Sequence, residues 1–293
     1  MKTIRARVSG FCMGVRRAVD MAIEAADRGG NVYTCGPLIH NTRVLDNLEK
    51  HGIMILGDGE VNSIPEGSSV VIRAHGIPPL DEKFLRDRGA KILDATCPHV
   101  KVSQKKAEQY AKNGYDVFLA GEKDHGEIIG IKGYAESALT GNPENTCMIV
   151  SNSAEAEAAA GTLSRQRPDA KTVLIGQTTI SPGEYESIGE SIRRFFPNLE
   201  IIGTICACTA DRQNALRELC RITDAVIIAG SRESANTRRL LLLAQDLGKP
   251  CWLAESAAEI PAEIMKYETV GIAAGASAPE ELIVEIENML KFF

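Results

Sequence analysis

Residues 97–127 read CPHVKVSQKKAEQYAKNGYDVFLAGEKDHGE, a cysteine followed by a helical stretch, a short apolar strand and a polar turn. The same frame occurs twice more. Cys12 leads through a helical stretch to NVYTCGPLIHN, and Cys206 leads through another to DAVIIAGSRESAN. Self-similarity of this kind indicates a chain built from repeated supersecondary units. We therefore interpret the sequence as three copies of one α/β unit.

The three copies agree at fixed offsets from the cysteine, without gaps. Each has glycine at cysteine plus 24, and two of the three have histidine at cysteine plus 28. The residues at plus 24, plus 28 and plus 30 are Gly36, His40 and Thr42; Gly121, His125 and Glu127; and Gly230, Ser234 and Asn236. The second and third copies also share glutamine at plus 7, as Gln104 and Gln213.

Each copy continues with a strand-like run that ends in a polar residue before a proline-led helix start. These runs are SVVIRAHGIPP with His75, TVLIGQTTISP with Thr178 beside Thr179, and TVGIAAGASAP with Ser277. The strands AKILDATC and LEIIGTIC then deliver Cys97 and Cys206, whereas the N-terminal TIRARVSGFC delivers Cys12.

Short apolar runs alternate with helical i, i+3, i+4 patterns, which predicts an α/β fold of parallel sheets flanked by helices. We expect three small α/β domains with mainly parallel sheets and pseudo-threefold symmetry, at residues 13–97, 98–205 and 206–293. Residues 1–12 are expected to complete the third domain as an added strand. Ligands of such sheets bind beyond the C-terminal strand ends, so the polar residues above should face one central pocket.

Composition narrows the functional classes. The 293 residues carry 33 basic and 39 acidic side chains, a net charge of −6, which argues against a general nucleic-acid or acidic-membrane binder. No apolar run reaches the roughly 18 residues of a membrane span. The start MKTIRARVSGFCMG lacks the apolar core of a signal peptide, so we expect a cytoplasmic location and no membrane association.

The eight cysteines need an explanation other than disulfides, which are rare in a reducing compartment. Cys12, Cys97 and Cys206 share one repeat position, and soft thiolates suit an iron–sulfur cluster, zinc or Cu(I). Buried apolar thiols are the alternative, but the shared position favours metal ligands. Cys208 is a weaker candidate for a further ligand. The other four are interpreted as core residues: Cys35, Cys147, Cys220 and Cys251.

The remaining repeat positions suggest an anion pocket and a proton donor. Histidines can donate to phosphate oxygens, and helix N-termini behind Ser234, Asn236 and Ser277 add backbone N–H groups, although ordinary N-capping is the alternative. Glu127 is the only carboxylate in the set, and is either a proton donor assisted by Thr178 or an exposed loop glutamate. The sequence has no phosphate-binding GxxxxGK[ST] loop and no dinucleotide fingerprint, so electrons must come from a separate protein rather than a bound flavin or NAD.

The ordered motifs resemble those of the 4-hydroxy-3-methylbut-2-enyl diphosphate reductase family, the last enzymes of the non-mevalonate isoprenoid route. The matching pieces, between residues 10 and 279, are GFCMGVRRAV, GPLIHN, IRAHGI, DATCP, DHGEIIG, GQTTIS, TICACTADRQ, SRESANTRRL and GASAP.

The resemblance implies three α/β domains around one central 4Fe–4S cluster with three cysteine ligands and one open iron. It places the ligands at Cys12, Cys97 and Cys206. It places diphosphate binding at His40, His75, Ser234, Ala235, Asn236 and Ser277. It places the substrate hydroxyl near His125, Glu127 and Thr178, with Glu127 as proton donor. The implied reaction gives isopentenyl and dimethylallyl diphosphate, with a ferredoxin or flavodoxin as electron donor.

Three positions depart from the family pattern. Gly126 stands where proline is common, Ala235 where serine is frequent, and Cys208 where cysteine is unusual. Two other functions remain open on the residues alone. A quinolinate synthase-like enzyme would need no external electrons, and a non-enzymatic metal-binding module would have a fully ligated metal.

Overall fold

The computed structural model describes residues 1–39, 41–57, 64–141 and 143–292. His40 lies outside these residues. In the described chain the strands form three four-stranded sheets, and the strand pairs whose register the structure describes are all parallel. The predicted α/β fold class is confirmed.

By its internal contacts the chain divides into two compact units. The first comprises residues 1–24, 37–53 and 207–293, and the second comprises residues 25–36 and 54–206. The three-domain division with its boundaries stays a prediction.

The sheet of the first unit has the strand order β1-β12-β10-β11. Its strands are β1 (Lys2–Arg5), β12 (Thr269–Ala274), β10 (Ala225–Ala229) and β11 (Cys251–Ala254). Strand β1 pairs with β12 in parallel, with Arg5 opposite Ile272. The N-terminal segment is thus joined to strands that lie more than 200 residues away in the sequence.

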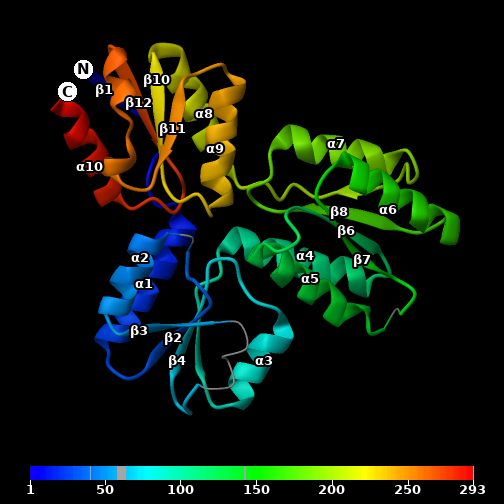
Figure 1. The fold of residues 1–293 in the computed structure, drawn as a ribbon. Coiled ribbons are helices and arrows are strands. Elements are labelled where there is room, and N and C mark those ends of the chain that lie inside the picture. The colour runs from blue at the N-terminus through cyan, green and yellow to red at the C-terminus, as the bar shows by residue number, and fades with distance from the viewer. Residues whose placement is uncertain (40, 58–63, 142, 293) are drawn as a thin grey trace. The chain divides into compact units, whose positions relative to one another are not determined.

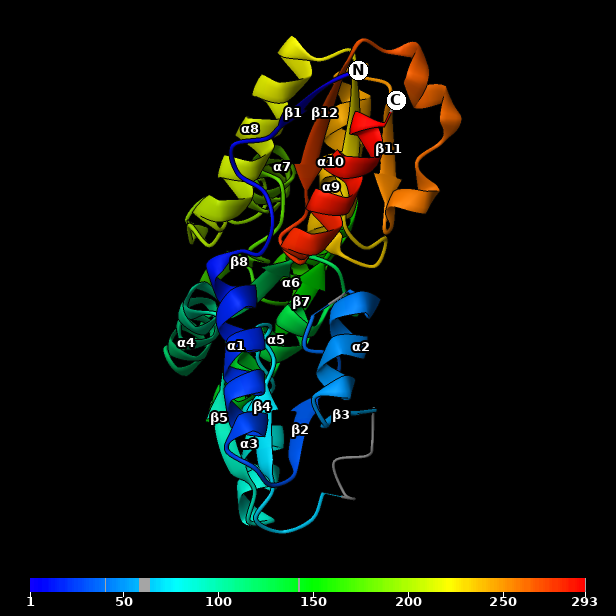
Figure 2. The same ribbon diagram turned by 90° about the vertical axis from the view of Figure 1, so that its left-hand side faces the viewer.

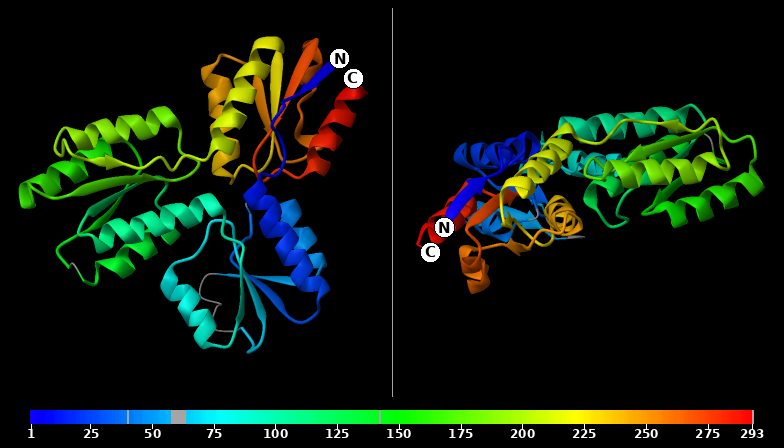
Figure 3. Two further views of the ribbon diagram at one scale, coloured as in Figure 1. Left: turned by 180° about the vertical axis from the view of Figure 1, so that it is seen from behind. Right: turned by 90° about the horizontal axis from the view of Figure 1, so that it is seen from above.

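Helices cover both faces of this sheet. They are α8 (Ala207–Ile222), α9 (Ala235–Asp246) and α10 (Glu280–Lys291), with the short 3-10 turns η2 (Ala257–Glu259) and η3 (Ala262–Lys266). Ile227 of β10 packs into the core against α10, whereas its neighbour Ile228 packs into the core against α8 and α9. Figure 1 and the reverse view in Figure 3 show α10 on the opposite side of the strands from α8. Burial on two faces explains why β10 is apolar at every position.

The first unit also carries most of α1 (Met13–Asp27) and all of α2 (Thr42–Lys50). Figure 2 shows the N-terminal strand β1 and the C-terminal helix α10 side by side. An ion pair between Arg5 of β1 and Glu280 of α10 joins them: Nη1 and Nη2 of the guanidinium donate to the two carboxylate oxygens at 2.6 and 2.5 Å.

The second unit contains the other two sheets. One has the order β3-β2-β4-β5, with β3 (Ile53–Leu56) at the boundary between the units, then β2 (Val32–Cys35), β4 (Ser69–Ile72) and β5 (Lys91–Asp94). The other has the order β7-β6-β8-β9, with β7 (Cys147–Val150), β6 (Asp116–Ala120), β8 (Thr172–Gly176) and β9 (Glu200–Ile201). The helices of this unit are α3 (Pro79–Asp87), α4 (Pro98–Lys112), α5 (Gly126–Leu139), α6 (Ser153–Gln166) and α7 (Pro182–Arg193).

Strands β6 and β8 are buried along their whole length. Phe118 packs with residues of α6 and α7, and Leu119 packs on the other face with residues of α4 and α5. Figure 1 shows this sheet between the two helix pairs. The sandwich fixes the C-terminal ends of β6 and β8, from which α5 and the Thr178 loop depart.

Candidate active site

A buried carboxyl group lies where β6 and β8 end. Glu127, in the first turn of α5, is 2% exposed, and Thr178 follows β8. The Thr178 N–H donates to Glu127 Oε1 at 2.7 Å, and the Thr178 hydroxyl donates to Oε2 at 2.9 Å. Burial raises the pKa of Glu127 to about 7, although the two hydrogen bonds from Thr178 act in the opposite direction and lower it. A carboxyl with this pKa can give up a proton near neutral pH, so its environment suits a general acid.

Two imidazoles accompany this carboxyl. His125 is the N-cap of α5, and its Nδ1 accepts a hydrogen bond from the Glu127 N–H at 3.2 Å. The neutral ring therefore carries its proton on Nε2, where it can donate to a ligand. His75 follows β4, and its ring lies 4.9 Å from that of His125, centroid to centroid, in an edge-on arrangement. The second unit thus brings His75, His125, Glu127 and Thr178 into one connected group.

The three predicted ligand cysteines are held by equivalent backbone bonds. The Cys97 N–H donates to the Ala74 carbonyl at 2.9 Å, and the Cys206 N–H donates to the Thr178 carbonyl at 2.9 Å. In the first unit the Cys12 N–H donates to the Ala276 carbonyl at 3.0 Å.

These bonds set the register of the repeat. They make Ala74, Thr178 and Ala276 equivalent, and therefore also the residues that follow: His75, Thr179 and Ser277. The sequence pattern grouped both Thr178 and Thr179 with His75 and Ser277. Within the repeat, Thr179 is the true counterpart, and Thr178 takes its place near Glu127 one residue earlier.

In the first unit, the start of α9 gathers buried polar groups. Ser234 caps the helix by accepting from the Thr237 N–H at 3.4 Å, as the capping alternative predicts. Asn236 is 6% exposed, and its Nδ2 has no hydrogen-bond partner among the described residues. Ala235 and Ser277 are also buried, at 4% and 6%. A buried, unpaired amide donor beside a helix N-terminus is suited to bind an anion.

The predicted site residues are divided between the two units. The first unit holds Cys12, Ser234, Ala235, Asn236 and Ser277. The second unit holds Cys97, Cys206, His75, His125, Glu127 and Thr178. Across the ranges that the structure describes, no three His, Cys, Asp or Glu side chains are grouped so as to hold a metal ion. The convergence of the three thiols on one cluster stays a prediction.

Cys208 lies in the first turn of α8, and both Cys208 and the predicted ligand Cys12 are partly exposed. The influence of the Cys12 thiol lowers the pKa of Cys208, and that of Cys208 raises the pKa of Cys12. The sequence showed Cys208 only as a neighbour of Cys206, and nothing in its spacing pointed to Cys12.

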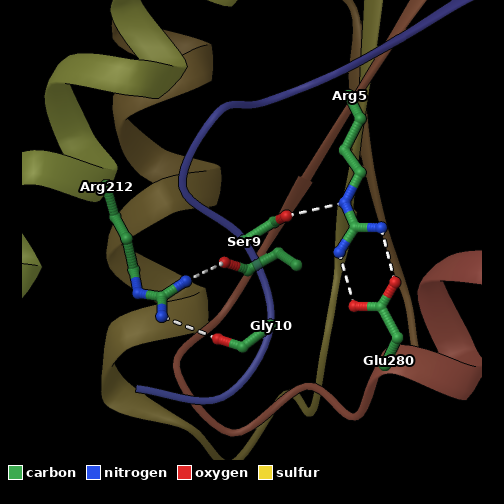
Figure 4. A network of polar contacts seen from close by, with 6 residues as sticks. Arg5, Ser9, Gly10, Arg212 and Glu280 are labelled. Carbon is green, nitrogen blue, oxygen red and sulfur yellow. Dashed lines mark hydrogen bonds and ion pairs between the residues drawn. The ribbon is translucent and has the colours of Figure 1, made fainter. Parts of the chain in front are cut away.

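Two further polar residues, Arg212 and Gln177, were not predicted to take part in the site. Arg212 of α8 is 3% exposed and donates to the carbonyls of Gly10 at 2.6 Å and Ala274 at 3.2 Å. Figure 4 shows this guanidinium reaching from the helix to the loop that precedes Cys12. Gln177 accepts from the Glu122 N–H and donates to Thr179, which ties together the loops after β6 and β8. Both lie within the motifs TICACTADRQ and GQTTIS, but the sequence alone could not reveal their buried contacts.

The strand ends of this α/β protein carry thiols, imidazoles and a buried carboxyl with a near-neutral pKa, side chains of the kinds that enzymes place at active sites. The family model of the LytB protein matches residues 3–291, and the chain belongs to this family. The resemblance inferred from the motifs is confirmed.

Curated relatives cover almost the whole chain. A 4-hydroxy-3-methylbut-2-enyl diphosphate reductase of Treponema denticola is 42% identical over 292 residues, 98% of each chain. The reductase of Alkaliphilus oremlandii is 36% identical over 291 residues, also 98% of each. Among solved structures, the reductase of Plasmodium falciparum matches with a TM-score of 0.87 at 27% identity, covering 99% of this chain and 88% of the other. A second, described as the terminal enzyme of the non-mevalonate pathway, matches with a TM-score of 0.73 at 34% identity over the full length of both.

Proposed function

We propose that this enzyme of the LytB family reduces (E)-4-hydroxy-3-methylbut-2-enyl diphosphate to isopentenyl and dimethylallyl diphosphate, the reaction of its relatives. The reaction removes the allylic hydroxyl as water and consumes two electrons and two protons. The observation that carries the proposal is the buried Glu127 carboxyl, held by Thr178 and adjacent to His125. Such a group supplies a proton to the leaving oxygen, so that water departs instead of hydroxide, which is a poor leaving group.

The family implies an iron–sulfur enzyme, and the donor set fits a 4Fe–4S cluster held by Cys12, Cys97 and Cys206. All three are free, partly exposed thiols at equivalent strand ends, and soft thiolates are the usual ligands of such clusters. When bound, a cluster with three protein ligands and one open iron supplies electrons and a Lewis acid for the substrate oxygen.

The chain's own residues bind and orient the substrate. The diphosphate is proposed to be bound by His40, His75, Ser234, Asn236 and Ser277, together with the Ala235 N–H. Asn236 supports this role, because its buried Nδ2 has no partner in the described chain and a phosphate oxygen would satisfy it. The Ala235 side chain adds no donor, so only its backbone N–H at the start of α9 can contribute.

Glu127, Thr178 and His125 are proposed to handle the proton. In its neutral form Glu127 donates to the departing hydroxyl, and Thr178 holds the carboxylate that results through the same two bonds of 2.7 and 2.9 Å. His125, with Nδ1 fixed by the Glu127 N–H, presents its Nε2 proton to the substrate. Burial of the carboxyl excludes water from this transfer.

We further propose that the electrons come from a separate ferredoxin or flavodoxin and that the enzyme acts in the cytoplasm. The eight cysteines are all free thiols, which supports a reducing compartment. Among the described residues, no helix is long and apolar enough to cross a membrane.

The test is anaerobic purification, iron and sulfide analysis, and an assay with a chemical reductant and the allylic diphosphate. We expect about four iron atoms per chain and reductant-dependent formation of both products. A colourless protein that takes up no iron on anaerobic reconstitution, or an iron-loaded protein inert toward this substrate, would contradict the proposal.

A further inference from the structure

A buried guanidinium lies in the first unit, beside the loop that leads to Cys12. It belongs to Arg212 of α8, which is 3% exposed. Its Nη2 donates to the Gly10 carbonyl at 2.6 Å and its Nη1 donates to the Ala274 carbonyl at 3.2 Å. Figure 4 shows the side chain reaching from the helix to the N-terminal loop. Arg212 thus joins α8 to two segments that lie far from it in the sequence.

Both of these segments position Cys12. Gly10 precedes Cys12 by two residues. Ala274 ends β12, and the Cys12 N–H donates at 3.0 Å to the carbonyl of Ala276, two residues further along the chain. The Cys12 Sγ accepts a hydrogen bond from the Val15 N–H at 3.4 Å. The guanidinium therefore connects the two backbone segments between which the Cys12 thiol is held.

The positive charge of Arg212 is buried, and the acceptors that the structure describes for it are two neutral carbonyl groups. Its Nε has no hydrogen-bond partner among the described residues. A guanidinium stays protonated in proteins, and a charge removed from water is costly unless an opposite charge accompanies it. Arg5, drawn in the same view, donates instead to both carboxylate oxygens of Glu280. An anionic group bound at Cys12 would supply a counter-charge for Arg212, and a cluster with thiolate ligands is such a group.

We propose that Arg212 positions Cys12 and is the internal counter-charge of the iron–sulfur cluster that Cys12 helps to hold. This inference rests on the proposed role of Cys12 as a cluster ligand. Arg212 is a positioning residue in this role, because it acts through the Cys12 loop and through its charge rather than by ligation.

Two effects on the cluster follow. Because the bond to the Gly10 carbonyl keeps the Cys12 loop in one conformation, iron is released slowly. Each electron that enters the cluster adds one negative charge, and a nearby buried cation stabilises that charge, so Arg212 raises the reduction potential. A merely structural role for Arg212 predicts no effect on the potential.

The test compares the parent with Arg212→Met, which removes the charge, and with Arg212→Lys, which keeps it. Each full-length protein is reconstituted anaerobically and titrated electrochemically with mediators, and the reduced cluster is followed by electron paramagnetic resonance. We expect Arg212→Met to lower the equilibrium constant for one-electron reduction about tenfold, which is a fall of about 59 mV in midpoint potential. Arg212→Lys should retain most of the parent value.

Arg217→Met is the matched control. Arg217 lies on the same helix, is partly exposed and donates to the Asn214 side chain at 3.0 Å. Removing this solvated charge should leave the midpoint potential unchanged. In a second measurement, iron loss to a chelator should be several-fold faster from Arg212→Met than from the parent or the control.

An Arg212→Met protein with a full cluster and the midpoint potential of the parent would overturn the inference. If Arg212→Met holds no cluster, the lysine variant decides the question. A cluster held by Arg212→Lys would support the need for a positive charge at this position. Loss of the cluster from both variants would show that the charge does not suffice and would overturn the inference.

The outcome for this inference and the outcome for the proposed function can be told apart, because the potential and the iron loss are measured without substrate. An iron-loaded parent that is inert toward the allylic diphosphate, with the expected shift in Arg212→Met, contradicts the proposed function alone. An active enzyme whose Arg212→Met variant keeps the parent potential contradicts this inference alone. A parent that assembles no cluster contradicts both.

Discussion

At the scale of single residues, burial gives Glu127 a pKa that suits proton transfer near neutral pH. Its pKa of about 7 means that the protonated form is plentiful at neutral pH and is lost as the pH rises. We expect Glu127→Gln to lower kcat by at least about 100-fold, because an amide keeps the shape of the side chain but cannot donate an acidic proton. Parallel iron analysis should find the parent content in the variant. Unchanged turnover would remove Glu127 from the proposed role.

Thr178 gives a prediction for pH dependence. Its hydroxyl bond at 2.9 Å favours the charged carboxylate and so lowers the pKa of Glu127. Thr178→Val deletes this bond but leaves the backbone N–H bond at 2.7 Å in place. The pKa of Glu127 should therefore rise, and the pH above which kcat falls should move upward. A profile of kcat against pH for the two proteins checks this, and a shift toward lower pH would contradict the assignment.

At the scale of elements, the first turn of α5 depends on a contact that the sequence did not reveal. At Gly126, where the family commonly has proline, the Arg73 guanidinium fills the space beside the backbone: an added Cβ would lie 2.6 Å from Nη2 and 2.9 Å from Cζ. Gly126 begins the helix, and its φ is not positive, so the glycine is required by this packing rather than by its backbone angle.

This packing predicts a coupled pair of substitutions. Gly126→Ala should lower the free energy of unfolding by about 1–2 kcal/mol, because the new methyl group displaces Arg73. In a protein that already carries Arg73→Ala, the same change should be neutral or stabilising, because alanine is the better helix former. Urea unfolding of the four proteins gives the coupling energy. An equal loss in both backgrounds would show that Arg73 is not the cause.

Helix α4 contains a buried amide without hydrogen bonds. Gln104 is 1% exposed, and neither its Nε2 nor its Oε1 has a partner among the described residues. Gln104→Met keeps the length of the side chain and removes the desolvation cost, so unfolding free energy should rise by about 1 kcal/mol. Gln177→Met is the control, since Gln177 is equally buried but bonded at both ends, and it should be destabilised. A loss of stability in both variants would indicate that Gln104 is satisfied in solution.

At the scale of the whole molecule, the repeat in the sequence predicted the α/β class, because the period of apolar residues and the glycine offsets are local properties. It could also place Cys97, His75 and Glu127 at strand ends. It could not predict the hydrogen bond from Arg212 to the Gly10 carbonyl, the Arg73–Gly126 packing or the depth at which Glu127 is buried. These depend on side-chain packing between segments far apart in the sequence, which no spacing encodes. The sequence also left open whether Thr178 or Thr179 is the counterpart of His75 and Ser277. The backbone hydrogen bonds of the three cysteines identify Thr179.

The equivalence of the three cysteines yields a last prediction. Cys12, Cys97 and Cys206 follow strands of three different sheets, and each is held by a backbone bond of 2.9–3.0 Å to the loop that follows a neighbouring strand. If each supplies one thiolate to the same cluster, alanine at any one of them should reduce iron and sulfide after anaerobic reconstitution to a small fraction of the parent value of about four each. Cys251→Ala, which removes a partly buried thiol of strand β11, should leave both unchanged. Because a shared cluster is all or none, the three losses should be similar in size; full iron content in any one of the three variants would exclude that residue as a ligand.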